Sequence, residues 1–472
     1  MKRFNQFIES KMFINLVFLL ALLLPASALL LRYQNNPTIP GHDSYYHLLQ
    51  AYTLNSYTGL EQDKFLFSVY DTLLSFNPVL FSQVLPLIFT VASLAVLYLL
   101  LQRLGFGRRL VHLAMFFMVL SPLTLHLGVL SDGFAFTFFL LIVGAYLFLS
   151  KDLIKVASSL VFFVLLLFSG PIYLFLLVLS LITYYLVTGK LGKRILGFLI
   201  IFGVVFMFYY GWVLFAFGIP MHSALDNLIP SFLSELGAST GFSVFNLLLV
   251  AWGLIFIWKQ KKIFYPIPFY LLIVAFSFVY FSGASLFLLV PFQLLAAYGL
   301  IKIGDTKWIL GRLHYYSVGL LVVALLISSF TYHSTLVSAE PTQEIIEGLL
   351  WLKGEKVDGF VLSDASRGYW IEAVAQKQAY TGSESIFIQD RDYRKNVSQT
   401  LLFTRNLVTA KNIAKENRIN YLFIDPAMKD GLVWQREDEG ILFLFRNNET
   451  FKKVYSLHGV EIWKVMTNDI NK

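Results

Sequence analysis

The sequence of 472 residues contains no cysteine. Disulfide bonds, thiol catalysis and thiolate metal sites are therefore excluded, although this absence does not identify the cellular compartment. Charged residues are also scarce, at 14%, where an average soluble chain carries about 25%. Hydrophobic residues make up 57%. A soluble fold of this composition would expose too much apolar surface, so lipid must solvate much of the chain.

Aromatic residues make up 17% of the chain, with 46 Phe and 25 Tyr. This abundance suits lipid-facing helices and the aromatic belts of a membrane interface. The net charge is +8, which could suggest a nucleic-acid partner. However, the basic residues of the first two thirds flank apolar segments, as a membrane-topology signal does. We therefore expect a lipid bilayer as a partner and no nucleic acid.

The apolar segments predict about eleven membrane-spanning helices, because a hydrocarbon core about 30 Å thick needs roughly 20 apolar residues per helix. The expected spans are 12–32, 79–102, 109–121, 133–150, 156–170, 171–187, 195–217, 243–258, 264–281, 286–303 and 313–332. The first run, Phe13 to Leu31, could instead be a signal peptide. Its length and the lack of a convincing cleavage site favour a retained helix.

Basic residues alternate between the loops. One set of loops contains Lys2, Arg3, Lys11, Arg103, Arg108, Arg109, Lys151, Lys155, Lys190, Lys193, Arg194, Lys259, Lys261, Lys262, Lys302, Lys307 and Arg312. In the other set, Lys64 is alone in a long first loop. The positive-inside bias makes the first set cytoplasmic. We therefore predict a multi-pass protein of the plasma membrane with a cytoplasmic N-terminus and an extracytoplasmic C-terminal region.

The predicted organisation is a transmembrane domain at 1–332, with long outer loops at 33–78 and 217–242, and an extracytoplasmic α/β domain at 333–472. Charged residues become frequent after His333. Periodicity there predicts helices at Glu344–Lys353, Tyr369–Lys377 and Leu401–Asn417, and strands at Phe360–Leu362, Tyr421–Ile424, Ile441–Phe445 and Val460–Val465. The predicted fold class is a polytopic α-helical membrane protein with a C-terminal α/β domain.

Three carboxylates are predicted at one depth on the outer side: Asp43 after the first helix, Asp132 before the fourth, and Glu235 in the second long loop. A carboxylate near a membrane usually has a function, because inserting one at the bilayer centre costs roughly 2.5–3.5 kcal/mol. Oxygen ligands from separate elements, completed by water and phosphate, suit Mg²⁺ or Mn²⁺. The three residues are therefore candidate metal ligands.

Each carboxylate also has a purely structural interpretation. Asp132 precedes Gly133 and is a plausible helix cap, and Glu235 could be a solvated loop acid. Asp43, with His42 and His47, could form a hydrated cluster. A histidine zinc site is less favoured, because no third histidine of a catalytic set is evident. Spacing alone does not decide between these interpretations.

Several short motifs resemble those of one enzyme family. They are Gly41–Leu48, Ser121–Asp132, Ser234-Glu235, Leu295–Leu300 after Pro291, Glu347–Lys353, Phe360–Ser363 and Gly368–Ile371. The first resembles the opening outer loop of GT-C glycosyltransferases, and more narrowly the Asp-x-Tyr-Tyr-His pattern of archaeal and bacterial single-subunit oligosaccharyltransferases. The others resemble later segments of that family, in the family's order. The resemblance touches both halves of the chain.

The resemblance implies a metal-dependent glycosyltransferase with a GT-C fold. Its donor would be a glycan on a polyprenyl phosphate or pyrophosphate, and its acceptor a protein asparagine. By resemblance, Asp43 binds the cation and helps position the acceptor, Asp132 adds a ligand, and Glu235 contacts both. The cation would be Mn²⁺ or Mg²⁺, neutralising charge on the leaving phosphate.

The chain departs from this family in its soluble domain. Where the family has Trp-Trp-Asp-Tyr-Gly, which reads the sequon hydroxyl, this chain has Asp364-Ala-Ser-Arg367-Gly368. Asp364, Arg367 and His47 are therefore candidates for contacts with a different acceptor or with the donor. Arginines that the family has after the first-loop histidine and before the late helix are replaced, at Leu49 and at Ala284-Ser285.

Two alternatives stay open for function. The first is an enzyme that takes a single sugar from a polyprenyl phosphate and acts on a lipid, a glycan or a protein hydroxyl. The second is a degenerate paralogue that binds lipid-linked glycan without catalysis. A transporter is less favoured, because broken helices with midplane polar sites are not evident. The sequence does not identify the sugar, the carrier, the acceptor or the oligomeric state.

Overall fold

The computed structural model describes residues 6–55, 69–190, 192–217, 232–238, 241–258, 265–306, 311–382, 391–436 and 438–466. The chain forms two compact units. One, here called the helical unit, comprises residues 1–32, 67–70 and 83–338, and the other, the C-terminal unit, comprises residues 33–66, 71–82 and 339–472. Lys64 and most of the predicted loop 217–242 lie outside the described residues. The predicted domain division stays a prediction.

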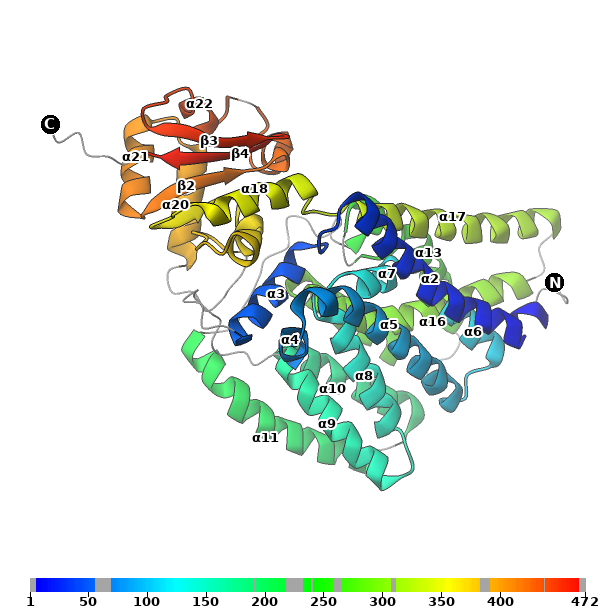
Figure 1. The fold of residues 1–472 in the computed structure, drawn as a ribbon. Helices are drawn as coiled ribbons and strands as arrows, with labels where there is room; N and C mark the ends of the chain where they lie inside the picture. The colour runs from blue at the N-terminus through cyan, green and yellow to red at the C-terminus, as the bar shows by residue number, and fades with distance from the viewer. Residues whose placement is uncertain are drawn as a thin grey trace. The chain divides into compact units, whose positions relative to one another are not determined.

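The helical unit consists of helices at each predicted span. They are α2 (Lys11–Asn35), α5 (Pro78–Arg103), α6 (Arg108–Leu120), α7 (Pro122–Val129), α8 (Phe134–Phe148), α9 (Leu153–Ser169), α10 (Pro171–Thr188), α11 (Gly192–Phe217), α13 (Val244–Ile257), α15 (Pro266–Tyr280), α16 (Ser285–Asp305) and α17 (Gly311–Val337) (Figure 1). Short 3₁₀ turns η2 (Ser234–Leu236) and η3 (Ser282–Ala284) precede α13 and α16, and α4 (Val69–Ser75) crosses into the C-terminal unit. The predicted helical class of this region is confirmed.

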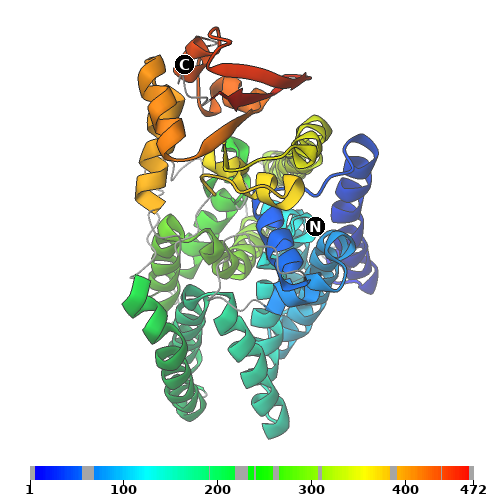
Figure 2. The same ribbon diagram turned by 60° about the vertical axis from the view of Figure 1, so that its left-hand side comes forward.

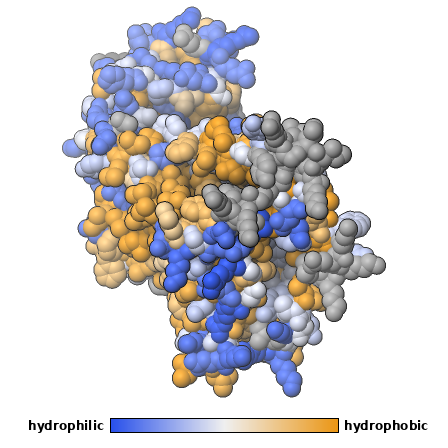
Figure 3. Space-filling model, turned by 90° about the vertical axis from the view of Figure 1, so that its right-hand side faces the viewer, coloured by the Kyte–Doolittle hydropathy of each residue, from blue (hydrophilic) through white to orange (hydrophobic). Residues whose placement is uncertain are grey.

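Within the described residues, four helices are long and apolar enough to cross a membrane: Lys11–Gln34, Pro78–Arg103, Ser282–Asp305 and Tyr316–Val337. Other apolar helices are shorter, at 10–17 residues. Figure 3 shows broad hydrophobic areas on one face of the molecule, as a lipid-contacting surface requires. The predicted number of about eleven spans therefore stays a prediction.

The third predicted span differs from a simple helix. Helix α6 ends at Leu120, and α7 continues after Ser121 at an angle of 60° to it. Pro122 stands at the first position of α7, where its missing N–H leaves no bond unmade. After the bend, α7 ends at Val129, shortly before Asp132 in the sequence.

Helices α13 and α16 pack with their backbones in close approach. A Cβ atom at Gly253 would lie 2.2 Å from the carbonyl oxygen of Leu295, and one at Gly299 would lie 2.5 Å from that of Leu249. Only glycine fits at such a separation, as in small-residue contacts between membrane helices. The buried side chains of Asn246 and Gln293 add a 2.6 Å hydrogen bond between the two helices. These contacts fix α16 against α13.

The C-terminal unit contains a four-stranded sheet in the order β1-β2-β4-β3. Strands β1 (Phe360–Leu362) and β2 (Ile419–Ile424) are parallel, whereas β4 (Val460–Val465) runs antiparallel to both β2 and β3 (Phe451–Leu457). His458 and Gly459 join β3 to β4 with φ angles of 48° and 83°. Positive φ at both turn residues is typical of a tight hairpin.

Both faces of this sheet are covered. On one face, Tyr421 and Phe423 pack against α18 (Gln343–Gly354), and also in this cluster are Tyr45, Leu48 and Leu49 of α3 (His42–Asn55). On the other, the alternate residues of β2 pack against α21 (Leu407–Glu416) and α22 (Ile441–Leu444). Figure 2 shows the orange helices α20 (Arg391–Phe403) and α21 beside the sheet. Helix α3, from the predicted first outer loop, is thus part of the C-terminal unit's core.

Most predicted elements of this region are present, but two predictions were wrong and one strand was not predicted. The predicted helix Leu401–Asn417 is two helices, α20 and α21, because Asn406 caps a new helix by accepting from Val408 and Thr409. The predicted strand Ile441–Phe445 is the helix α22, since a short apolar run does not distinguish the two. Strand β3 was missed, because it is an edge strand with exposed lysines. Tyr369–Lys377 forms α19 (Gly368–Trp370) and the π-helical turn η5 (Ile371–Ala375).

Candidate functional site

Asp132 is held between two elements of the helical unit. Its Oδ1 atom accepts a 3.0 Å hydrogen bond from the backbone N–H of Phe134, the first residue of α8. The N-cap position of α8 is Gly133, so Asp132 is not the helix cap and binds the first helical N–H from one residue before it. Its Oδ2 atom lies 2.5 Å from Nε2 of His126 on α7. Both side chains are only 5% exposed, so this carboxylate is buried, oriented and paired.

His126 extends this pair to a third element. Its Nδ1 atom lies 3.3 Å from the hydroxyl of Tyr332 on α17. Directly before Asp132 in the sequence, the hydroxyl of Ser131 lies 2.6 Å from that of Tyr70. Tyr332 also packs with Leu125, Val129 and other apolar residues in a buried cluster. The orientation of Asp132 is thus fixed by both polar and apolar contacts.

Glu235 lies in η2 and is fixed by hydrogen bonds to both of its oxygens. Oε1 accepts from the Ser328 hydroxyl at 2.7 Å, and Oε2 accepts from the backbone N–H of Val244 at 3.1 Å. Partial burial acts to raise the pKa of Glu235, but the hydrogen bonds, that of Ser328 foremost, hold its pKa below the usual value. The carboxylate is therefore ionised and directed rather than freely solvated.

Helix α17 contacts both carboxylate networks. Ser328 binds Glu235, and Tyr332 contacts the His126 that pairs with Asp132. Residues four apart lie on one face of a helix and are separated by about 6 Å along its axis. A single helix face therefore positions two of the three predicted metal ligands.

Asp43 belongs to the C-terminal unit. It is exposed in the first turn of α3, which follows Gly41 at φ 86°. The unsatisfied N–H groups and dipole of a helix N-terminus favour a negative charge there. His47 lies four residues later, on the same side of the helix. The structure thus places two of the predicted site residues on one helix.

His47 has a carboxylate partner that the sequence did not indicate. Its Nδ1 atom lies 2.6 Å from Oδ1 of Asp71, whose side chain is 7% exposed. In this pair Nδ1 of His47 donates the hydrogen bond and the carboxylate oxygen of Asp71 accepts it. Such a pair fixes the tautomer and orientation of a functional histidine.

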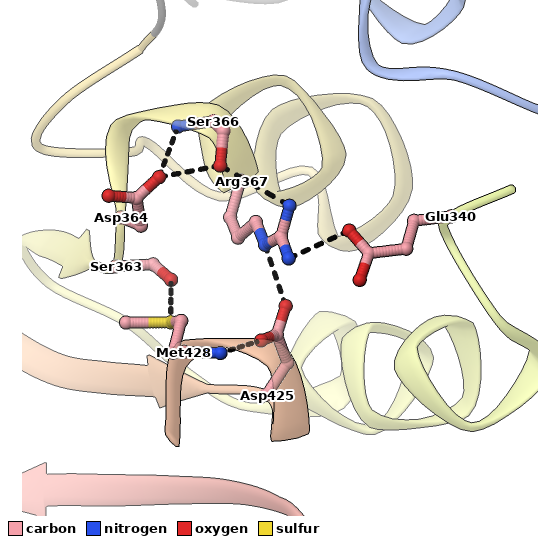
Figure 4. A network of polar contacts seen from close by, with 7 residues as sticks. All are labelled: Glu340, Ser363, Asp364, Ser366, Arg367, Asp425 and Met428. Carbon is pink, nitrogen blue, oxygen red and sulfur yellow. Dashed lines mark hydrogen bonds and ion pairs between the residues drawn. The ribbon is translucent and has the colours of Figure 1, made fainter. Parts of the chain in front are cut away.

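The segment from Asp364 to Gly368, where the sequence departs from the resembled family, has a closed network of its own (Figure 4). Asp364 accepts from the N–H of Ser366 at 2.9 Å. Arg367 is buried and forms ion pairs with Asp425, at 2.6 Å, and Glu340, at 2.7 Å. The predicted roles of Asp364 and Arg367 in ligand contacts stay predictions, and both side chains have internal partners.

His42 lies against this segment. Its ring stacks on Tyr369 with centroids 4.8 Å apart. Burial foremost, together with the positive charge of Arg367, lowers the pKa of His42 to about 4. His42 is therefore neutral near pH 7 and serves as a packing surface at the start of α3.

The donor chemistry of these residues fits a hard divalent cation. Asp43, Asp132 and Glu235 offer carboxylate oxygens, which hard divalent cations prefer as ligands. In the described part of the chain, however, no three His, Asp or Glu side chains lie close enough together to hold an ion. The three carboxylates are therefore named as ligands by their chemistry, and the assembled site stays a proposal.

Sequence reasoning missed His126, Asp71, Ser328 and Tyr332. A signal existed for His126, because an ionisable residue in an apolar segment is a site candidate by default. None existed for Ser328 or Tyr332, whose partners lie 93 and 206 residues away. Only the folded chain brings such residues together.

No model of a known protein family matches the sequence, and no curated protein matches it. Solved structures do match. The apo oligosaccharyltransferase of Archaeoglobus fulgidus aligns with TM-score 0.60 and 13% identity, covering 89% of this chain and 70% of that one. The same enzyme tethered to an acceptor peptide containing the NVT sequon aligns with TM-score 0.57 and 12% identity, again covering 89% of this chain and 70% of that one. Its complex with Zn and sulfate aligns with TM-score 0.58 and 14% identity, covering 87% of this chain and 68% of that one. The resemblance predicted from the motifs is confirmed at the level of the fold.

Proposed function

We propose that this chain is a membrane glycosyltransferase of the oligosaccharyltransferase type. It transfers a glycan from a polyprenyl phosphate or pyrophosphate to a protein asparagine at the outer face. A fold alone does not imply an activity. The observation that carries the proposal is that α17 orients two buried or directed carboxylates, Asp132 and Glu235, in a chain with this fold.

The proposed reaction is a displacement with inversion at the anomeric carbon. The acceptor nitrogen forms a bond to this carbon as the bond from carbon to the phosphate oxygen breaks, and the phosphate leaves with the electron pair. The acceptor nitrogen loses one proton, and Asp43, which is exposed at the start of α3, would accept it. Glu235 orients the acceptor amide.

Asp43, Asp132 and Glu235 would hold Mn²⁺ or Mg²⁺. When bound, such an ion neutralises the charge that develops on the leaving phosphate. The paired His126 keeps Asp132 oriented, and the low pKa of Glu235 keeps it ionised. The Zn complex of the Archaeoglobus fulgidus enzyme supports a metal site in this fold.

The proposed arrangement in the cell follows from the loop charges. The N-terminus is cytoplasmic, and the C-terminal domain at 333–472 is extracytoplasmic at the plasma membrane. The donor lipid then enters from the bilayer while the reaction takes place at the outer interface. The acceptor-peptide complex of the Archaeoglobus fulgidus enzyme supports a peptide partner.

A second candidate function has one observation in its favour. Arg367 and Asp364 occupy the place of the hydroxyl-reading motif and are engaged with internal partners. An enzyme that takes one sugar from a polyprenyl phosphate and acts on a lipid or glycan acceptor needs no such motif. We keep this as the alternative.

The test uses the purified full chain in detergent with Mn²⁺, a pool of lipid-linked oligosaccharides and a fluorescent Asn-x-Thr peptide. We expect a mobility shift of the peptide with the wild type and none with Asp43→Asn. Transfer to a lipid acceptor with an inert peptide would instead favour the alternative. Absence of transfer to either acceptor, with no cation binding, would indicate a degenerate paralogue.

A further inference from the structure

The segment that leads to Asp43 is bound to the start of the C-terminal region. Asn36 and Thr38 each donate a side-chain hydrogen bond of 2.8 Å to the carbonyl of Pro341. The backbone N–H of Gly41 donates to the carbonyl of Glu340, also at 2.8 Å. Helix α3 begins at the next residue. The position of its first turn, and of Asp43, is therefore tied to the carbonyl groups of Glu340 and Pro341.

Glu340 is in turn held by Arg367. The guanidinium Nη2 lies 2.7 Å from Oε2 of Glu340, while Nε donates to Oδ2 of Asp425 at 2.6 Å (Figure 4). Asp425 follows β2, is fully buried, and also accepts from the N–H of Met428. Arg367 thus joins the rigid end of a core strand to Glu340. The planar guanidinium suits this, because it can serve two carboxylates at once.

The residues after Arg367 contact α3 directly. His42 stacks on Tyr369, and Tyr46, one turn later, lies with its ring centroid 5.0 Å from that of Tyr369. Trp370 packs under the guanidinium of Arg367, 4.5 Å from the ring centroid. One short segment therefore holds the start of α3 by two routes, through Glu340 and through Tyr369.

We infer that residues 364–370 form a positioning platform for Asp43, and that Arg367 is a positioning residue acting through Glu340. The inference rests on the proposed function, in which Asp43 binds the cation and the acceptor. In this inference, the divergent segment has a structural role and does not bind the sequon hydroxyl. An anionic ligand at Arg367 would have to displace a buried ion pair, and breaking such a pair is strongly unfavourable.

The test measures hydrogen exchange of the peptides covering residues 36–49 in the full chain. The main variant is Glu340→Ala, which keeps the backbone carbonyl and leaves the Arg367–Asp425 pair intact. We expect exchange at the start of α3 to rise about three- to tenfold, as for loss of one charge-assisted hydrogen bond at a partly exposed site. Glu340→Gln, which can still accept from Arg367, should give an intermediate rate.

Arg405→Met is the matched control, because it removes an arginine from the exposed ion pair with Asp438 in the same unit. It should leave exchange at α3 unchanged. In transfer assays, Glu340→Ala should raise the Mn²⁺ concentration for half-maximal rate severalfold, with a smaller change in kcat at saturating Mn²⁺. Equal exchange in Glu340→Ala and the wild type would overturn the inference. A wild type that transfers no glycan would refute the proposed function but leave the exchange result decisive for the platform.

Discussion

Nε2 of His126 lies 2.5 Å from Oδ2 of Asp132, and both side chains are buried in the helical unit. Asp132 was expected from the sequence, whereas His126 was not. The pair shows how the chain keeps a carboxylate in an apolar environment: the charge has a hydrogen-bonding partner on a neighbouring helix, and that partner is itself held by Tyr332. The contact that orients this proposed metal ligand therefore also satisfies a buried carboxylate.

Replacing His126 with Ala should destabilise the folded protein, because it leaves a buried carboxylate without its partner. The expected loss is about 3–5 kcal/mol, as for other broken buried pairs. His126→Asn, whose amide can still donate, should recover part of it. Thermal unfolding in detergent measures both. Equal midpoints for His126→Ala and the wild type would show that the pair contributes nothing to stability.

Helix α17 should control cation affinity. We expect Ser328→Ala and Tyr332→Phe each to weaken Mn²⁺ binding about threefold to tenfold, because each removes about 1 kcal/mol of hydrogen bonding that orients a carboxylate. Electron paramagnetic resonance of free Mn²⁺ measures this without an activity assay. Thr335→Val is the control, because its hydroxyl donates to the carbonyl of Thr331 in the same helix. Unchanged binding in both test variants would argue against α17 as the positioning helix.

The close approach of α13 and α16 predicts that alanine substitution will have different effects on stability at two glycines. Gly253→Ala should destabilise by about 1–3 kcal/mol, the usual penalty for overpacking, since its Cβ would lie 2.2 Å from a backbone oxygen. Gly203→Ala on α11 should be neutral or slightly stabilising, because no atom of the described residues lies within 4 Å of its added Cβ. Thermal unfolding compares the two. Tolerance of alanine at Gly253 would contradict this packing.

We expect Glu461 to make a pH-dependent contribution to the free energy of unfolding. Burial acts to raise the pKa of Glu461, but its bonds to Lys453, Lys429 and Trp463 lower the pKa below the usual value. A lowered folded-state pKa gives stability that is present above the unfolded-state pKa and lost as the pH falls through the folded-state value. Glu461→Gln should therefore destabilise by about 1 kcal/mol at pH 7, and the difference should vanish once Glu461 is protonated in acid. Melting curves at several pH values would test this, and a pH-independent difference would refute it.

The cysteine-free sequence allows a direct test of topology. We expect a membrane-impermeant maleimide to label Glu416→Cys, at the exposed end of α21, in intact cells. Lys151→Cys, in a predicted cytoplasmic loop and also exposed, should react only after permeabilisation. Reversed labelling would overturn the predicted orientation.

By itself, the sequence determined the helical membrane character of this protein, its C-terminal sheet domain, and the candidate carboxylates. Apolar periodicity and loop charge are local properties, and short motifs carry the resemblance to a known fold. Local patterns also misled, as at Ile441–Leu444, where a short apolar run forms a helix.

The tertiary structure alone decided which side chains hold these carboxylates. Ser328 reaches Glu235, Asp71 meets His47, and Arg367 binds Glu340 beside the segment leading to Asp43. These contacts depend on how helices and strands pack. The residues between the two partners in the sequence do not indicate that the partners will meet. The physical reason is that a hydrogen bond acts over about 3 Å, whereas sequence patterns report only on residues a few positions apart.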